Sequence, residues 1–180
     1  MAKIGTVIDT IKLIKNWPTN FAEYFGMIKQ GHIVYILRTG IRYKVRAGTY
    51  DRKIIDELFI RKTYTREDFG IGEDDLVVDV GAHIGTFTIM ASRLARKGKV
   101  YAFEPMPENF ALLKDNVEIN AAHNVVVINK AVASRKGRKK LFVCTENTGG
   151  HSFYGGGRKG RYVKTTTLED FVKEYSIGRE

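Results

Sequence analysis

The sequence predicts an α/β protein built around a parallel sheet, and three observations in its central part carry this prediction. A short apolar run, Leu76–Val80, is typical of a strand that is covered on both faces. A turn with two glycines, Gly81–Gly85, leads from it into a stretch with helical spacing of apolar residues. A second β-rich run follows at Lys99–Phe103, and a third at Val125–Ile128. Alternating strands and helices in this order indicate a right-handed parallel unit.

Two helices are expected to connect these strands. The first follows Gly85, and its apolar residues are Ile84, Phe87, Ile89, Met90 and Leu94. The second begins at Pro105 and Pro107, because proline is tolerated in the first turn of a helix, and it ends near Asn120. Its apolar residues are Phe110, Leu112, Leu113, Val117 and Ile119.

The first 70 residues are predicted to form an α+β cap, and residues 71–180 the α/β core. An amphipathic helix, which Pro18 ends, and a second short helix open the cap. A β-hairpin turning at Thr39-Gly40 follows, and then a short helix around Ile54–Phe59. The first helix suits packing against its own domain or a partner, and it also suits a membrane surface.

The part after the third strand is predicted to form a hairpin and a last helix. The hairpin pairs Lys139–Cys144 with Arg161–Lys164. Between them, Thr148–Gly160 is rich in glycine and reads equally as a substrate lid or as a flexible connector. Thr167–Asp170 resembles a capping box that opens the last helix.

An acid at the end of the second strand indicates a nucleoside ligand. Glu104 lies roughly 20 residues beyond the last glycine of the turn, where a carboxylate takes the hydroxyls of a ribose. The order Asp79-x-Gly81-x-x-x-Gly85 differs from the G-x-G-x-x-G of dinucleotide sites. An acid before the turn repels a pyrophosphate and suits a cationic ligand. S-adenosylmethionine (SAM) is therefore favoured over NAD. In the alternative interpretation, the glycines only allow tight strand-to-helix packing.

At these residues the chain resembles the FkbM family of SAM-dependent methyltransferases. The matching segments, all in the same order, are Arg46–Glu57, Val78–Thr88, Ala102–Pro105, Asn129–Gly137 and Thr166–Phe171. The resemblance covers about Arg38–Phe171 and implies a Rossmann-like class I methyltransferase fold. Family members continue into a fourth strand after this part. The core is therefore expected to be truncated after its third strand, which would leave Leu76–Val80 as an apolar edge suited to homo-oligomer formation.

The resemblance implies methyl transfer from SAM to a hydroxyl oxygen of a small molecule or glycan. The alternative is a SAM-binding or interaction module without turnover, completed by another chain or segment. Asp79 would orient the methionine end of SAM, beside His83, and Glu104 would bind the ribose. Ala131 would lie on the adenine side, and backbone access would come from Gly81, Ala82 and Gly85. No residue suggests itself as the catalytic base.

Charge and composition limit the other classes of function. The 30 Lys and Arg against 20 Asp and Glu give a net charge of +10, concentrated at Arg135–Lys140 and Arg158–Arg161. This charge reads as solvated loops, or as a footprint for nucleic acid or anionic lipid, although no RNA-binding motif supports a nucleic-acid partner. A lone cysteine, Cys144, predicts a buried thiol and a cytoplasmic location. Neither a metal site nor a transmembrane segment is expected.

Overall fold

A three-stranded parallel sheet forms the centre of the molecule. The computed structural model describes residues 4–60, 70–142 and 160–178. Within them, β4 (Lys99–Phe103) lies between β3 (Leu76–Val80) and β5 (Val125–Ile128), and both pairs are parallel. All three strands lie where the apolar runs predicted them, which confirms the α/β class.

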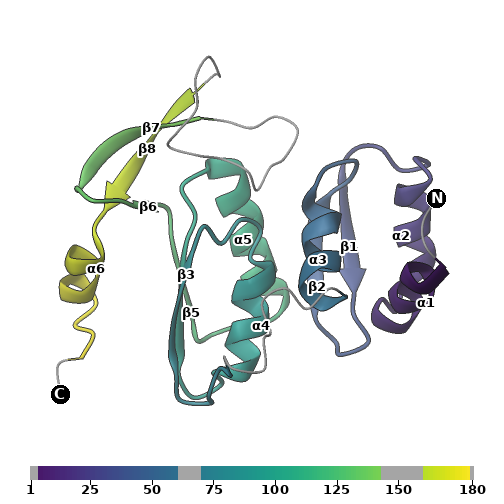
Figure 1. The fold of residues 1–180 in the computed structure, drawn as a ribbon, viewed down its shortest axis with the longest axis horizontal. Coiled ribbons are helices and arrows are strands. Elements are labelled where there is room, and N and C mark those ends of the chain that lie inside the picture. The colour runs from purple at the N-terminus through teal and green to yellow at the C-terminus, as the bar shows by residue number, and fades with distance from the viewer. Residues whose placement is uncertain (1–3, 61–69, 143–159, 179–180) are drawn as a thin grey trace.

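Helices cover both faces of this sheet. Figure 1 shows α4 (Thr86–Leu94) and α5 (Pro107–Ile119) on one face and α6 (Leu168–Glu174) on the other. Phe171 of α6 packs edge-on against Tyr101 and Phe103 of β4, with ring centroids 5.0 and 5.1 Å apart. The predicted cap of α6 is present, because the Thr167 hydroxyl accepts a hydrogen bond from the backbone N–H of Asp170 at 3.0 Å. Alternating elements thus give a layered, Rossmann-like core.

The first strand of this sheet is less buried than predicted. β3 was expected to be covered on both faces, but Leu76 is 45% exposed and Val80 56% exposed. The reason is its position, because within the described residues β3 pairs with β4 alone and so forms an edge of the sheet. An apolar run reports strand formation, whereas burial also depends on the neighbours that the strand acquires.

A second, smaller sheet follows the parallel one. It has the order β6-β8-β7, formed by β6 (Ala131–Val132), β7 (Gly137–Phe142) and β8 (Gly160–Thr166). The antiparallel pair β7–β8 is the predicted hairpin. The two-residue strand β6 was not predicted, since so short a segment leaves no periodicity. Cys144 and residues 148–159, including most of the predicted lid, lie outside the described residues.

The N-terminal part contains the predicted helices and hairpin. Its elements are α1 (Ile4–Leu13), α2 (Trp17–Tyr24), β1 (His32–Ile36), β2 (Arg42–Arg46) and α3 (Asp51–Phe59). Pro18 was expected to end the first helix, but it lies in the first turn of α2, where its missing N–H costs no hydrogen bond. Among the described residues, no helix is long and apolar enough to cross a membrane.

Three asparagine side chains bind the backbone along the two outer edges of the β1–β2 hairpin. Asn116 of α5 accepts from the N–H of Lys44 at 2.6 Å and donates to its carbonyl oxygen at 3.1 Å. Asn120, one turn later, makes the same pair of bonds to Arg42 at 2.9 and 2.7 Å. On the other edge, Asn16 accepts from the N–H of Ile36 and donates to the carbonyl oxygen of Val34, both at 2.9 Å.

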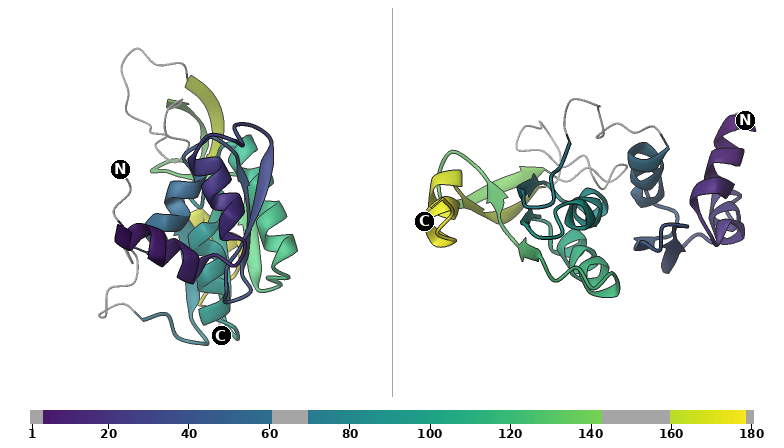
Figure 2. Two further views of the ribbon diagram at one scale, coloured as in Figure 1. Left: turned by 90° about the vertical axis from the view of Figure 1, so that its right-hand side faces the viewer. Right: turned by 90° about the horizontal axis from the view of Figure 1, so that it is seen from below.

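The hairpin also shares a hydrophobic core with the helices of the α/β unit. Its members include Tyr43 and Ile55 from the N-terminal part and Ile84, Ile89 and Leu112 from the rest. Figure 1 shows the hairpin beyond α4 and α5, and Figure 2 shows the same succession from below. The division of the chain into two domains at residue 70 stays a prediction. The packing brings α3 close to the turn that follows β3.

Candidate functional site

The turn after β3 crosses over the end of β4. The backbone N–H groups of Gly81 and Ala82 both donate to the carbonyl oxygen of Phe103 at 2.9 Å. Gly81 and Gly85 have φ angles of 87° and 85°, in the left-handed region that favours glycine. The turn therefore presents its backbone at the carboxyl ends of two parallel strands, where open α/β sheets bind their ligands.

The two glycines of the turn differ in their surroundings. A Cβ atom on Gly85 would lie 2.5 Å from Cδ1 of Leu113, so this glycine allows close packing of α5. A Cβ atom on Gly81 would meet no atom within 4 Å. The packing interpretation thus explains Gly85, while Gly81 leaves open space beside the backbone.

A cavity of about 320 Å³ adjoins this open space. Four residues of the predicted site line it, namely Asp79, Gly81, Ala82 and His83. Its remaining lining comes from the strand, from α4 and from the region of α3: Tyr50, Ile54, Glu57, Leu58, Val78, Val80, Thr86 and Phe87. Three predicted site residues, Gly85, Glu104 and Ala131, are not among the lining residues.

Asp79, a half-buried residue, contributes a carboxylate to this cavity. Burial raises the pKa of Asp79 from 3.8 to about 6, although a hydrogen bond from Thr88 opposes the rise. The Thr88 hydroxyl donates to Oδ2 of Asp79 at 2.5 Å. A carboxylate with a raised pKa is stabilised by any cation that enters the cavity, because the cation offsets the cost of burying its charge.

Glu104 lies deeper than the sequence analysis expected. Its side chain reaches back under the turn, and only 4% of the residue is exposed. Its two carboxylate oxygens accept backbone hydrogen bonds from His83 and Met106, both at 2.8 Å. Burial raises the pKa of Glu104, while these bonds and one from Asn109 lower it. The carboxylate therefore holds the turn to the start of α5.

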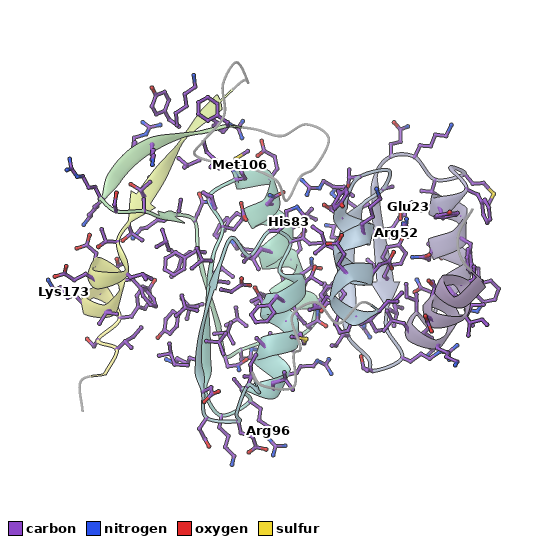
Figure 3. The ribbon with its side chains drawn as sticks, viewed as in Figure 1. Glu23, Arg52, His83, Arg96, Met106 and Lys173 are labelled. Atoms are coloured by element: carbon purple, nitrogen blue, oxygen red, sulfur yellow. The ribbon has the colours of Figure 1, made fainter. Side chains whose placement is uncertain are left out.

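The imidazole of His83 points toward the N-terminal part. Its Nε2 lies 3.4 Å from Nη2 of Arg46 and 3.5 Å from Oδ1 of Asp51. Arg46 binds Asp51 through two side-chain hydrogen bonds of 2.8 Å, and it also donates to Asn109 of α5 at 2.9 Å. Figure 3 shows His83 on the side of the core that faces α3.

This ion pair keeps Asp51 charged in a buried position. Burial alone would raise the pKa of Asp51, but hydrogen bonds from the side chain and backbone of Arg46 outweigh it and lower the pKa. The sequence analysis assigned no role to Arg46, Asp51 or Tyr50. The signal was present, because all three lie in the segment Arg46–Glu57 that carries part of the family resemblance.

Ala131 belongs to a different part of the molecule from the cavity. It lies in β6 and packs with Met106, Leu141 and Val163 in a small buried cluster. Its neighbour Asn129 donates to the carbonyl oxygens of Glu104 and Pro105 at 2.8 and 3.3 Å. The segment after β5 thus closes onto the end of β4, and an adenine-side role for Ala131 stays a prediction.

The parallel sheet, the turn after β3 and the acids at two strand ends define a Rossmann-like domain of the methyltransferase class. The model of the methyltransferase FkbM domain matches residues 79–179, which is more than half of the chain. This chain belongs to that family. The match begins at Asp79 and includes every residue of the predicted cofactor site.

Two curated relatives and one solved structure show similarity over shorter parts. Methyltransferase 1 of Beauveria bassiana is 38% identical over 69 residues, which are 38% of this chain and 26% of that protein. The 31-O-demethyl-FK506 methyltransferase FkbM of Streptomyces tacrolimicus is 40% identical over 60 residues, or 33% and 23% of the two chains. The matches thus span about a quarter of each relative.

The structure of methyltransferase FkbM from Methylobacillus flagellatus covers 64% of this chain and 26% of its own, with 16% identity and a TM-score of 0.41.

Proposed function

We propose that this chain binds SAM where β3 and β4 end and transfers its methyl group to a hydroxyl oxygen of a small molecule or glycan. The observation that supports this proposal most strongly is the half-buried carboxylate of Asp79, which has a pKa raised to about 6 and lies in the wall of a 320 Å³ cavity. A cationic ligand suits this wall, and SAM carries both an ammonium and a sulfonium. Family membership supports an enzyme over a binding module without turnover.

The residues around the turn fit the methionine end of SAM. Asp79 offers a carboxylate to the ammonium, directly or through water, and the open side of Gly81 allows a ligand to approach the backbone. Glu104 fits a ribose less simply. A carboxylate has about four acceptor positions, and His83, Met106 and Asn109 already use three of them. One position therefore remains for a ribose hydroxyl.

SAM, when bound, supplies the methyl group on a positively charged sulfur, which is the reactive centre. The protein's contribution is then to orient this group and to exclude water. Ile54, Leu58 and Phe87 give the cavity apolar walls, while Asp79 and Gly81 supply its polar side. The acceptor oxygen has to lie in line behind the methyl group. The group that removes its proton is not assigned.

Calorimetric titration with SAM, S-adenosylhomocysteine and NAD tests this proposal. We expect saturable binding of the first two and none of NAD. Asp79→Asn should weaken SAM binding at least tenfold at pH 7.5, since it removes the charge that faces the ammonium. Asp74→Asn is the matched control, because Asp74 is exposed, lies just before β3 and does not line the cavity. NAD binding without SAM binding contradicts the proposal.

A further inference from the structure

The β7–β8 hairpin has five exposed cationic side chains, Arg138, Lys139, Lys140, Arg161 and Lys164, and its register places two of them opposite each other. Arg138 is paired directly with Lys164, and Lys140 with Tyr162. Directly paired residues of an antiparallel ladder point to the same face, so these four side chains share one face. All four are exposed, Tyr162 by 62%. Like charges in directly opposite positions destabilise a hairpin.

No acid compensates the opposed pair within the described part of the chain. Arg138 and Lys164 make no ion pair there, and the Lys140 amino group lies 5.5 Å from the centre of the Phe142 ring. On the opposite face, by contrast, Arg161 is paired with Glu108 at 2.5 Å. Among the described residues, an acid thus neutralises Arg161, while Arg138 and Lys164 lie opposite each other without one.

Both unneutralised cations line the same cavity, which has a volume of about 270 Å³. Arg161 and Tyr162 also contribute to it, and its other walls are Pro105, Pro107, Asn129 and Val163. Pro105 follows the acid at the end of β4, and Asn129 follows the end of β5. Figure 1 shows the hairpin at the same end of the molecule as the start of α5. The cavity therefore adjoins the edge of the sheet where the methyl donor is proposed to bind.

We propose that this cavity binds a phosphate group of the methyl acceptor, so that the acceptor is a phosphate ester. The inference rests on the proposed methyl transfer, whose substrate class it specifies. A guanidinium fork and an ammonium group from directly paired residues in the wall of one cavity suit the several oxygens of a phosphate. A bound phosphate would also remove the repulsion between Arg138 and Lys164. The exposed Tyr162 ring offers a surface on which a base or sugar attached to that phosphate stacks.

Calorimetric titration of the full chain with inorganic pyrophosphate, in the absence of SAM and at two salt concentrations, tests the site. We expect saturable binding that weakens as salt rises. The double variant Arg138→Gln, Lys164→Gln should bind pyrophosphate at least tenfold more weakly. Its affinity for SAM and its fold should be unchanged. Lys114→Gln on α5 is the control for net charge, because Lys114 is exposed and does not line the cavity.

A readout of stability separates binding from a structural role. Lys164→Gln alone should leave the melting temperature unchanged or raise it, because it removes a like-charge pair, while it weakens pyrophosphate binding. A single-stranded oligonucleotide as second probe identifies the source of the phosphate. A steeper salt dependence than that of pyrophosphate indicates a polynucleotide, and an equal one a small phosphate ester.

Equal pyrophosphate affinity for the double variant and the parent overturns the inference, and so does equal weakening by Lys114→Gln. Absence of pyrophosphate binding also overturns it. Loss of SAM binding with intact pyrophosphate binding would instead contradict the proposed methyl transfer and leave the phosphate site standing.

Discussion

The ends of β3 and β4 each carry an acid with a raised pKa, but the two acids differ in their hydrogen bonds. Glu104 accepts hydrogen bonds from two backbone N–H groups and from Asn109. Asp79, within the described residues, is bound by one hydroxyl, that of Thr88. Within the described residues, the carboxylate of Glu104 therefore accepts three hydrogen bonds and that of Asp79 one.

From this difference we infer a mainly structural role for Glu104 and a ligand-binding role for Asp79. Glu104 serves the turn because donors from the turn and from α5 converge on it. Asp79 has acceptor capacity to spare and faces a cavity, so its charge is available to a ligand. The two acids also repel each other, and this repulsion contributes to the raised pKa of Glu104. Replacement of each carboxylate by a carboxamide tests the distinction directly.

The largest expected effect is that of Glu104→Gln. Glutamine replaces one acceptor oxygen by an NH₂ group, which then faces a backbone N–H, so one buried donor loses its partner. We expect a loss of about 3 kcal/mol in the free energy of unfolding, from the cost of an unsatisfied buried donor together with the lost charge-assisted bond. Urea denaturation followed by circular dichroism measures it. A loss below about 0.5 kcal/mol would remove Glu104 from its structural role.

The matched substitution Asp79→Asn should have the opposite sign. Asp79 ionises at about 3.8 in the unfolded chain and at about 6 in the folded one, so folding is penalised as the pH rises through this window. The penalty is complete above pH 6 and amounts to about 2 to 3 kcal/mol. Asparagine still accepts from Thr88 without this cost. Denaturation at pH 8 should therefore show a more stable variant, and at pH 3.5 the two proteins should be equal.

Binding of SAM should depend on the protonation of Asp79. Below pH 6 the carboxyl group is neutral in the free protein, so a cationic ligand loses its attraction. We expect the affinity to fall up to about tenfold per pH unit between pH 6 and 5, and to be constant between pH 7 and 8. Calorimetry in buffers of these pH values measures the profile. Asp79→Asn should bind weakly with a flat profile over the same range, and a flat profile for the parent chain contradicts the binding role.

The smallest expected effect is that of Thr88→Val, which has nearly the same shape. It removes the hydroxyl that donates to Asp79, so the pKa of Asp79 should rise above 6. Stability at pH 8 should fall by about 1 kcal/mol, the usual worth of one hydrogen bond. Titration of the Asp79 carboxyl carbon by NMR checks the shift. An unchanged pKa would show that the hydroxyl does not stabilise the charged form.

The central fold could be predicted because each element carries its own local pattern. Apolar runs identified β3, β4 and β5, and the two glycines identified the turn between β3 and α4. For β3 the two sequence arguments differed. Its apolar run suggested a strand covered on both faces, because such a run contains no information on its neighbours, whereas the family resemblance predicted an exposed apolar edge. Among the described residues β3 is such an edge.

Four of the seven predicted site residues line the cavity, but the sequence did not predict the environment of these seven residues. The burial of Glu104 could not be predicted from its residue type, because glutamate is seldom fully buried. Its burial depends on the N–H groups of His83 and Met106, which reach it only after the turn and α5 have formed. The wall formed by Tyr50 and Leu58 is likewise set by tertiary packing. Such contacts join segments that are distant in sequence and leave no periodic signal.

The asparagines that line the β1–β2 hairpin determine where this molecule can extend a sheet. A strand edge offers a row of backbone donors and acceptors that template another chain. Asn116 and Asn120 occupy these groups on β2, and Asn16 occupies them on β1. The side-chain amides thus occupy backbone donors and acceptors on both outer edges of the hairpin, where another strand would otherwise bind. This arrangement disfavours strand addition to the β1–β2 hairpin. The parallel sheet ends, among the described residues, in β3 and β5, and the apolar margin of β3 is one place where a further strand would pair.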